Sequence, residues 1–267
     1  MPRDRPLTEL LGQLERYYDA APRTAARVEE VGPFSVFIGT GRWSYYARPR
    51  LGVTDEFTVE DVQAALARKR EAGQPESIEW VHETTPSLLA AAREAGLEVL
   101  EAPLMVLDRS AWPAPEAPAG IALRVLDADE PAVAESVAVQ NVGFGAAGTA
   151  PGPQGHAARD AALESDHDFL RERMRRGLTV TAVAEGEYGV VAAGAHQPVG
   201  GVTEIVGVAT LPVVRRQGLG SAVTGALVED ALAHGVETVF LSAGSEDIAR
   251  VYGRLGFKRV GTACIVG

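Results

Sequence analysis

Residues 213–222, with the sequence VVRRQGLGSA, contain two glycines separated by one residue. They follow a strand-like segment, residues 203–211, and run into a helix-like segment, residues 219–235. A strand that passes through a glycine-rich turn into a helix points backbone N–H groups and the positive end of the helix at one place. This arrangement is typical of phosphate binding, although an ordinary turn before a helix has the same local pattern.

The segments around this turn predict an ordered α/β domain. Three strand-like runs, joined by turns at Gly186 and at residues 198–201, predict an antiparallel meander. The runs are residues 179–185, 189–197 and 203–211. Two helical patterns precede them, and a strand, a short helix and a last strand follow the long helix. The preceding helices are residues 129–142 and 162–176, and the later segments are 236–243, 246–256 and 258–266.

The first part of the chain repeats this pattern at a distance of 160 residues. Residues 77–100 then align with 236–260, and Gly96 coincides with Gly256. The helical pattern at 58–73 falls near the long helix that follows the glycine-rich turn, but the glycines themselves are replaced by DEFTVE. We therefore predict two tandem copies of one unit, of which the second alone keeps the loop. The alternative is two unrelated strand–helix–strand units.

A segment rich in Pro and Ala separates the two halves. Residues 109–120, RSAWPAPEAPAG, show neither helix nor strand periodicity and read as a linker. We accordingly predict one domain at 1–108 and another at 121–267. A second irregular stretch, residues 143–155, is either exposed slack or a functional loop.

Composition excludes several classes of protein. With 25 basic and 36 acidic residues the net charge is −11, which disfavours nucleic acid as a partner. The single cysteine, Cys264, excludes a disulfide framework, and no Cys/His cluster has zinc-ligand spacing, so we expect no metal. No apolar run approaches membrane-spanning length, and the charged first residues do not resemble a signal peptide. A cytoplasmic protein without a membrane partner is expected.

Three phosphate-binding motifs compete for the glycine-rich turn. A P-loop requires a Lys after its last Gly, and none is present. A dinucleotide fingerprint requires Gly or Ala where Val223 stands, and an acidic residue at the end of the next strand, which is missing. The third motif is Arg-x-x-Gly-x-Gly, and residues 215–220 match it.

This third motif resembles the pyrophosphate-binding loop of the GCN5-related N-acetyltransferases, the GNAT family. Residues 249–257, ARVYGRLGF, resemble that family's later segment ending in Tyr-x-x-x-Gly-Phe. The resemblance covers roughly 121–266. It implies an α/β (α+β) acyl-CoA N-acyltransferase fold, with a mixed, mostly antiparallel sheet flanked by helices, and with a degenerate copy at 1–108 in front of the catalytic one.

The resemblance also implies acetyl-CoA as cosubstrate and an N-acetyltransferase that acts on a primary amine of a small molecule or a protein. The strand before the loop would pair with the pantetheine arm, and an N–H near Val208 would meet the thioester carbonyl. The implied cofactor-binding residues are Val208, Ala209, Thr210, Arg215, Arg216, Gln217, Gly218, Leu219, Gly220 and Ser221.

Two side chains are candidates for proton transfer. Tyr252 is the candidate general acid, because a phenol is protonated at neutral pH; packing under the last strand is the alternative. Glu204 is the candidate base, and an exposed carboxylate at a strand end is the alternative. Strand alternation predicts one shared face for Glu204, Val206, Val208 and Thr210. His196, expected across the hairpin from Glu204, is read as a polar strand residue rather than a base.

A second function stays open. A CoA-binding regulatory or structural module without turnover would have the same loop. The presence of Tyr252 favours the enzyme.

Overall fold

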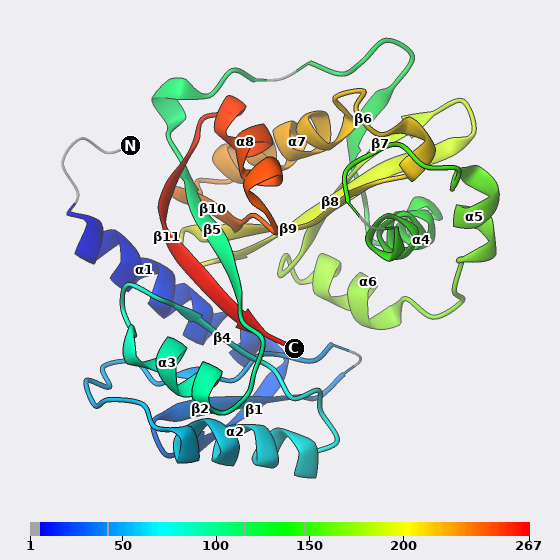
Figure 1. Ribbon diagram of the computed structural model, residues 1–267. Helices are drawn as coiled ribbons and strands as arrows, with labels where there is room; N and C mark the ends of the chain where they lie inside the picture. The colour runs from blue at the N-terminus through cyan, green and yellow to red at the C-terminus, as the bar shows by residue number, and fades with distance from the viewer. Residues whose placement is uncertain (1–5, 42, 115, 147) are drawn as a thin grey trace. The chain divides into compact units, whose positions relative to one another are not determined.

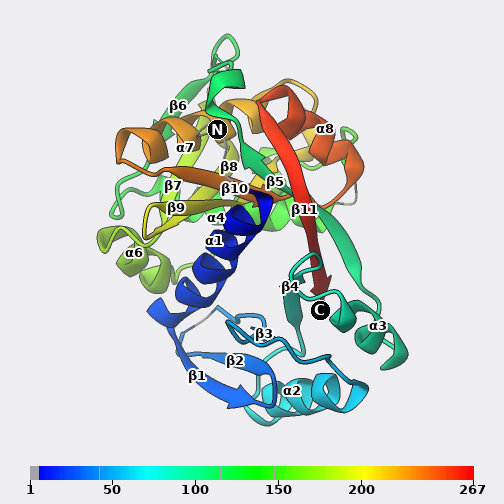
Figure 2. The same ribbon diagram turned by 90° about the vertical axis from the view of Figure 1, so that its left-hand side faces the viewer.

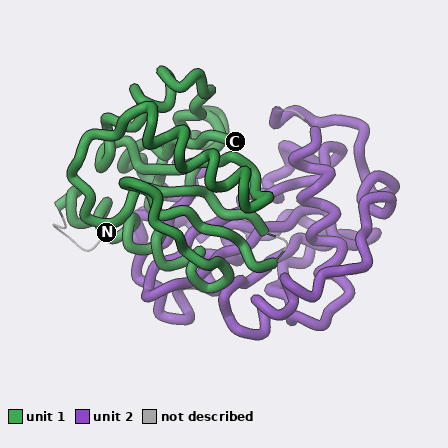
Figure 3. The backbone as a smooth tube through the Cα atoms, turned by 90° about the horizontal axis from the view of Figure 1, so that it is seen from below, with its two compact units in different colours: residues 1–106, 242–250, 258–267 green, residues 107–241, 251–257 purple. Residues whose placement is uncertain are grey.

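The computed structural model describes residues 6–41, 43–114, 116–146 and 148–267, and these form two compact units (Figure 3). Unit 1 comprises residues 1–106, 242–250 and 258–267, and unit 2 comprises 107–241 and 251–257. The compact units therefore do not follow the chain in two successive blocks. The domain limits at 108 and 121 stay a prediction about where one copy ends and the next begins.

Unit 1 begins with a helix and a small antiparallel sheet, followed by two helix–strand pairs. Strands β1 and β2 form a hairpin in which Val31 pairs with Phe34, and β3 pairs with β2. Its elements are α1 (Leu7–Ala20), the 3-10 turn Pro22–Thr24, β1 (Ala26–Val31), β2 (Phe34–Gly39), β3 (Arg48–Pro49), α2 (Val59–Glu71), β4 (Ile78–Val81), α3 (Ser87–Glu94) and β5 (Leu100–Leu107).

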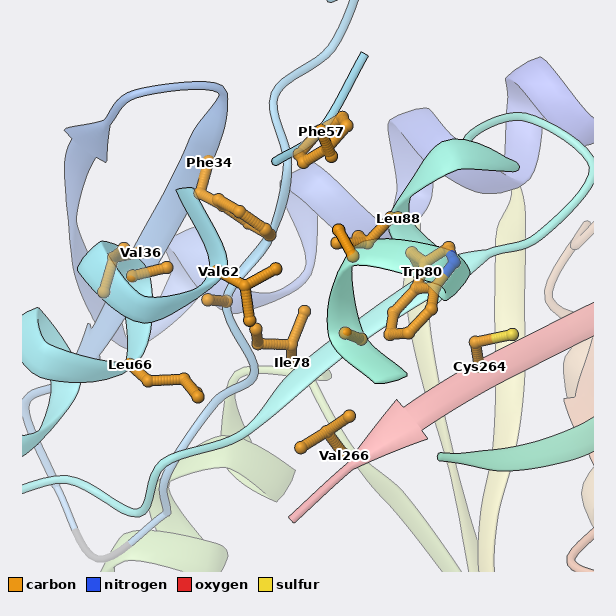
Figure 4. Close-up of a cluster of buried hydrophobic side chains, with 14 of the residues drawn as sticks. Phe34, Val36, Phe57, Val62, Leu66, Ile78, Trp80, Leu88, Cys264 and Val266 are labelled. Carbon is orange, nitrogen blue, oxygen red and sulfur yellow. The ribbon is translucent and has the colours of Figure 1, made fainter. Parts of the chain in front are cut away.

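The strand β11 (Phe257–Val266) completes unit 1 from the other end of the chain. It lies between β4 and β5, and its antiparallel register with β4 places Cys264 opposite Trp80 (Figures 1 and 2). Cys264 and Val266 are buried in the apolar cluster of unit 1 (Figure 4). The cluster also contains Phe34, Val36, Ile38, Phe57, Val62, Leu66, Ile78, Trp80 and Leu88.

Unit 2 contains the predicted meander. Its strand order is β10-β9-β8-β7-β6, with β7, β8 and β9 antiparallel and β10 parallel to β9, so the meander prediction is confirmed. Its elements are the 3-10 turn Arg109–Ala111, β6 (Ala122–Val125), α4 (Ala132–Gly145), α5 (His156–Ala161), α6 (Asp168–Arg175), β7 (Val180–Gly186), β8 (Gly189–Val199), β9 (Val202–Thr210), the 3-10 turn Pro212–Val214, α7 (Leu219–Ala233) and β10 (Thr238–Ser242). Helix α8 (Glu246–Arg254) links the units along the chain.

The helices α4 and α7 cover opposite faces of this meander (Figure 1). Sequence periodicity located most of these elements, but the strand β6 and the helix α5 were missed. The predicted helix 162–176 was also too long at its start, because α6 begins at Asp168. The predicted linker begins with the 3-10 turn Arg109–Ala111, and its residue Pro115 lies outside the described residues.

The internal repeat is visible in the elements themselves. Adding 160 to the bounds of α2 gives 219–231, against 219–233 for α7, and adding 160 to β4 gives 238–241, against 238–242 for β10. Gly96 and Gly256 follow corresponding helices and have φ of 81° and 85°. Glycine adopts this left-handed conformation without the strain that a Cβ causes, so the two glycines end their helices in the same way.

The described part of the chain contains no helix that is both long enough and apolar enough to cross a bilayer.

Candidate functional site

The strand that leads to the glycine-rich turn carries a bulge at Gly207. The β8–β9 register passes from Ala195 opposite Val206 to Ala193 opposite Ala209, so two residues of β9 face one of β8. Gly207 has a φ of 63°, and a Cβ there would lie 2.6 Å from Nε2 of Gln140. Glycine adopts this conformation without strain and leaves room for the Gln140 amide.

Beyond the bulge, Val208 points to the α7 side of the sheet. A Cβ on Gly194, which opposes the bulge, would lie 2.9 Å from Cγ2 of Val208 and 3.2 Å from Leu227 of α7. Ala209 points to the other side, since a Cβ on Gly143 of α4 would lie 2.9 Å from its Cβ. The absence of a Cβ at Gly143 lets α4 approach this end of the strand.

Before the bulge, the even-numbered side chains of β9 point to the opposite side of the sheet from the even-numbered ones after it. His196 is hydrogen-bonded to Thr203 at 2.9 Å and to Asp230 of α7 at 3.0 Å, so Thr203 faces α7 and Glu204 faces away from it. The sequence predicted one shared face for Glu204, Val206, Val208 and Thr210. That prediction is wrong, because the extra residue of the bulge shifts the alternation by one position.

His196 and Glu204 do not lie opposite each other. The register places His196 opposite Ile205 and Glu204 opposite Gln197, so the expected position of His196 across the hairpin from Glu204 is corrected by one residue. Burial lowers the pKa of His196, and its neighbour Asp230 opposes this shift. A buried imidazole with both ring nitrogens hydrogen-bonded acts as a polar strand residue here.

Strand β9 extends well beyond its pairing with β10. Their parallel register runs only from Val202 with Thr238 to Glu204 with Phe240, whereas β9 continues to Thr210. Within the described residues, the edge of β9 from 205 to 210 therefore has no strand partner on the β10 side. An extended ligand can add to such an edge through backbone hydrogen bonds.

The glycine-rich turn bends sharply between the strand and α7. Arg216 and Gly218 both adopt left-handed backbone conformations, with φ of 67° and 82°. Arg216, Gln217 and Gly218 are exposed. Gly220 lies against the end of β9, because a Cβ there would be 3.8 Å from both Thr210 Oγ1 and Val208 Cγ1.

The amide N–H groups of residues 216–221 have no acceptor among the described residues, and the first one to find a backbone acceptor is Ala222, whose N–H donates to Gly218 O at 3.0 Å. No side chain of the described residues caps α7, and the first turn of this helix contains no acidic residue. A helix start with open N–H groups and an uncompensated dipole attracts an anion. We call residues 215–221 the cradle.

The corresponding helix start in the first half is closed. Thr58 Oγ1 accepts from the Asp61 N–H at 3.2 Å, and the Asp61 carboxylate accepts from the Thr58 N–H at 3.0 Å. Glu60 adds a second acidic side chain to this first turn of α2. The capping box uses the open donors and places negative charge where an anion would bind.

Arg215 joins the cradle to the loop that follows α4. Its guanidinium donates to four carbonyl oxygens, at 2.7–3.2 Å, belonging to Gly143, Ala146, Gly148 and Ala150. Further along the loop, Gly152 N–H donates to Pro212 O and Val213 N–H donates to Gln154 O, both at 3.1 Å. The irregular stretch 143–155 is therefore anchored beside the cradle, although residue 147 lies outside the described residues.

Tyr252 reaches the second turn of α7. Its hydroxyl shares a hydrogen bond with Thr224, whose own Oγ1 donates to Gly220 O at 2.8 Å. Burial raises the pKa of Tyr252 to about 12, and the bond to Thr224 opposes the shift. The ring also packs edge-on against Phe257, with 5.8 Å between centroids. The phenol is thus protonated throughout the neutral range and linked to the cradle.

The fold brings the end of β9, the cradle and Tyr252 together, and it places Glu204 on the sheet face away from α7. Three residues of this site were missed by sequence reasoning: Gln140, Gly143 and Thr224. Gln140 and Thr224 lie inside predicted helices, where nothing in the local sequence distinguishes a side chain that faces the site from its neighbours. Gly143 was placed in the irregular stretch 143–155, whereas α4 continues to Gly145. Gly207 is a local signal for the bulge, because a glycine inside a strand pattern often marks one, but the alternation of residues 203–211 predicts a regular strand.

Comparison with known proteins bears on the family and the fold. Residues 148–257 match the family model described as "Acetyltransferase (GNAT) family". No curated protein matches the sequence. Among solved structures, a GCN5-related N-acetyltransferase from Kribbella flavida is similar over 96% of this chain and 95% of its own, with a TM-score of 0.69 and 23% identity.

A second solved structure bears on the repeat. A tandem GNAT protein from the clavulanic acid biosynthesis pathway is similar over 97% of this chain and 94% of its own, with a TM-score of 0.56 and 15% identity. At these identities the likeness concerns the fold, and it extends over both halves. The predicted GNAT fold in a tandem arrangement is confirmed, and residues 148–257 are similar to the acetyltransferases of the GNAT family.

Proposed function

We propose that unit 2 transfers an acetyl group from acetyl-CoA to a primary amine, on a small molecule or a protein. The observation that carries the proposal is the cradle at the uncapped start of α7, where the N–H groups of residues 216–221 find no acceptor in the part of the chain that the structure describes. The match of residues 148–257 to an acetyltransferase family supports an acyl-CoA as the anion bound there.

The cradle residues Arg216 to Ser221 would hold the pyrophosphate through their backbone amides. Arg215 serves indirectly, because its guanidinium fixes the loop after α4. The pantetheine arm would pair with the edge of β9 at Val208–Thr210, which β10 leaves open. This route leads from the cradle towards the bulge, where the thioester would lie.

The reaction forms a C–N bond and breaks a C–S bond. The unprotonated amine attacks the thioester carbon, and the backbone N–H of Val208 stabilises the oxyanion. The amine proton passes to Glu204, directly or through water. As the thiolate departs, Tyr252 hydrogen-bonds the sulfur and supplies its proton. A pKa of about 12 ensures that the phenol enters the reaction protonated.

Replacing Tyr252 with Phe tests the acid. Because general acid catalysis contributes ~10²-fold or more, we expect kcat for thiol release from acetyl-CoA to fall by about that factor, with the dissociation constant for CoA unchanged. Since the raised pKa keeps the phenol protonated, Tyr252 should cause no loss of wild-type activity below about pH 11. Thiol release would be measured against pH over a panel of amines.

The exposed Tyr188 provides the matched control, and Tyr188→Phe should keep the full rate. If Tyr252→Phe releases thiol as fast as the wild type does, Tyr252 is not the acid.

A CoA-binding regulatory or structural module without turnover is the second candidate. The hydrogen bond that ties the Tyr252 hydroxyl to Thr224 favours it, because a phenol held in this way must first release its partner to reach a thiolate. Tight CoA binding without thiol release for any amine of a broad panel would support the module over the enzyme.

A further inference from the structure

Gln140 of α4 makes one specific contact with the strand that borders the open edge. Its Nε2–H donates to Gly207 O at 2.9 Å, at the bulge of β9. We propose that Gln140 is a positioning residue for acyl transfer: by holding this carbonyl, it aims the Val208 N–H at the thioester oxygen. The proposal rests on the proposed function, since it concerns the oxyanion donor of that reaction.

Peptide geometry fixes where the Val208 N–H points. The described peptide bonds include no cis bond, and in a planar trans peptide the C=O and the N–H point in opposite directions. Because Gly207 O is turned towards Gln140 on α4, the Val208 N–H of the same peptide is turned away from α4. Gln140 therefore sets the direction of a group that it does not touch.

A second hydrogen bond defines the side of the strand. Leu211 N–H donates to Val191 O of β8 at 2.9 Å. Successive N–H groups of an extended strand alternate between its two edges, so the N–H of Ala209 points towards β8 and that of Val208 points away from it. The Val208 N–H consequently lies at the edge that β10 leaves after Glu204.

The peptide at the bulge needs a contact that fixes its orientation. Gly207 has a left-handed φ of 63° and no Cβ, so its peptide is freer to rotate than one in a regular ladder. Gly143, one helical turn further along α4, packs against Ala209 and keeps the helix close. The hydrogen bond from Gln140 then fixes the peptide before substrate arrives. A donor that is already oriented stabilises an oxyanion without reorganisation at the moment of reaction.

A purely structural role for Gln140 makes a different prediction. The thioester carbonyl is present in acetyl-CoA and absent from CoA, whereas both carry the same pyrophosphate and pantetheine. Loss of a structural contact would weaken both ligands alike. Loss of an aimed N–H would weaken acetyl-CoA selectively.

The test is Gln140→Met, which keeps the length of the side chain and removes the donor. We expect calorimetry to show acetyl-CoA binding about fivefold more weakly and CoA binding less than twofold more weakly. With an amine that the wild type accepts, kcat should fall by about 10²-fold, while KM for acetyl-CoA changes by no more than the binding does. Asn141→Ala, at the exposed neighbour on α4, should leave both affinities and kcat unchanged.

Equal weakening of both ligands, or of neither, would overturn the proposal for Gln140 and leave the proposed function standing. If the wild type binds neither acetyl-CoA nor CoA, the proposal for Gln140 and the proposed function both fail. Should Gln140→Met unfold at a much lower temperature, Gln140→Glu replaces it, because its carboxylate keeps the shape and polarity but cannot donate to Gly207 O. The same selective loss is then expected.

Discussion

A single residue decides which way the end of β9 faces. The left-handed Gly207 inserts an extra position into the strand, and as a result Val208 and Glu204 point to opposite sides of the sheet. In the cradle, Gly218 and Arg216 adopt the same conformation, which costs a residue with a Cβ about 1–2 kcal/mol. Strain in a side chain-bearing residue is typical of ligand-binding turns.

Gly218→Ala tests whether the cradle depends on this conformation. Gly218 and Gly235 flank α7 with φ of 82° and 79°, and neither has an atom within 4 Å of a Cβ added to it. Both alanine variants should therefore lose about 1 kcal/mol of unfolding free energy. We expect only Gly218→Ala to weaken CoA binding, by about tenfold, because only that turn presents the N–H groups. If calorimetry gives the Gly218→Ala and Gly235→Ala variants the same affinity for CoA, the cradle is not part of the binding site.

The difference between the halves lies at the starts of two equivalent helices. At α2 the capping box and an acidic first turn occupy the donors, and at α7 the same donors are open. Aligning the two halves of the sequence located this difference, because the cradle and the capping box are each formed by residues that are close together in the sequence. A local pattern can be read without knowing what packs against it.

Ser221→Asp would copy the first half into the second, since 221 is the counterpart of Asp61. A carboxylate in the first turn interacts favourably with the helix dipole by about 0.3–1 kcal/mol, so the unfolding temperature should rise slightly. The same charge repels a bound pyrophosphate, and we expect CoA binding to weaken at least tenfold, about 1.4 kcal/mol. Asn141→Asp adds an identical charge on α4 and should change neither quantity. An unchanged affinity for CoA in Ser221→Asp would contradict the anion-binding role of α7.

Other elements escaped prediction for physical reasons. The strand β6 and the helix α5 are too short to show a period, and their ends are set by packing. The contacts of Gln140 with Gly207 and of Tyr252 with Thr224 join residues that are far apart in the sequence. The alternation of β9 failed because one residue in a left-handed conformation outweighs a regular period.

At the scale of the whole molecule, the two compact units do not correspond to two successive halves of the chain. The strand β11 pairs with β4 and buries Cys264 and Val266 in the core of unit 1. Unit 1 is therefore built from both ends of the chain. Periodicity predicted the strand itself, but its neighbours follow from the topology alone.

Val266→Ala should accordingly destabilise unit 1. Removing buried methyl groups costs about 1–3 kcal/mol, and hydrogen exchange should show faster exchange of β4 amides than of β10 amides. The control is Val239→Ala, since Val239 is a buried residue of β10 in unit 2, and it should give the reverse order. If both variants increase exchange equally in β4 and β10, the units do not open separately.

The position of β11 also sets the order in which the protein can be completed during synthesis. Strands β4 and β5 emerge long before residues 257–266, which must lie between them. At ~5–20 residues per second the ribosome needs roughly 10–30 s to add the intervening chain. Throughout that time both strands present an unpaired edge, and such edges promote association with other chains. Unit 1 thus begins to form before unit 2 and is completed after it, and we expect the nascent chain to depend on chaperones during this interval.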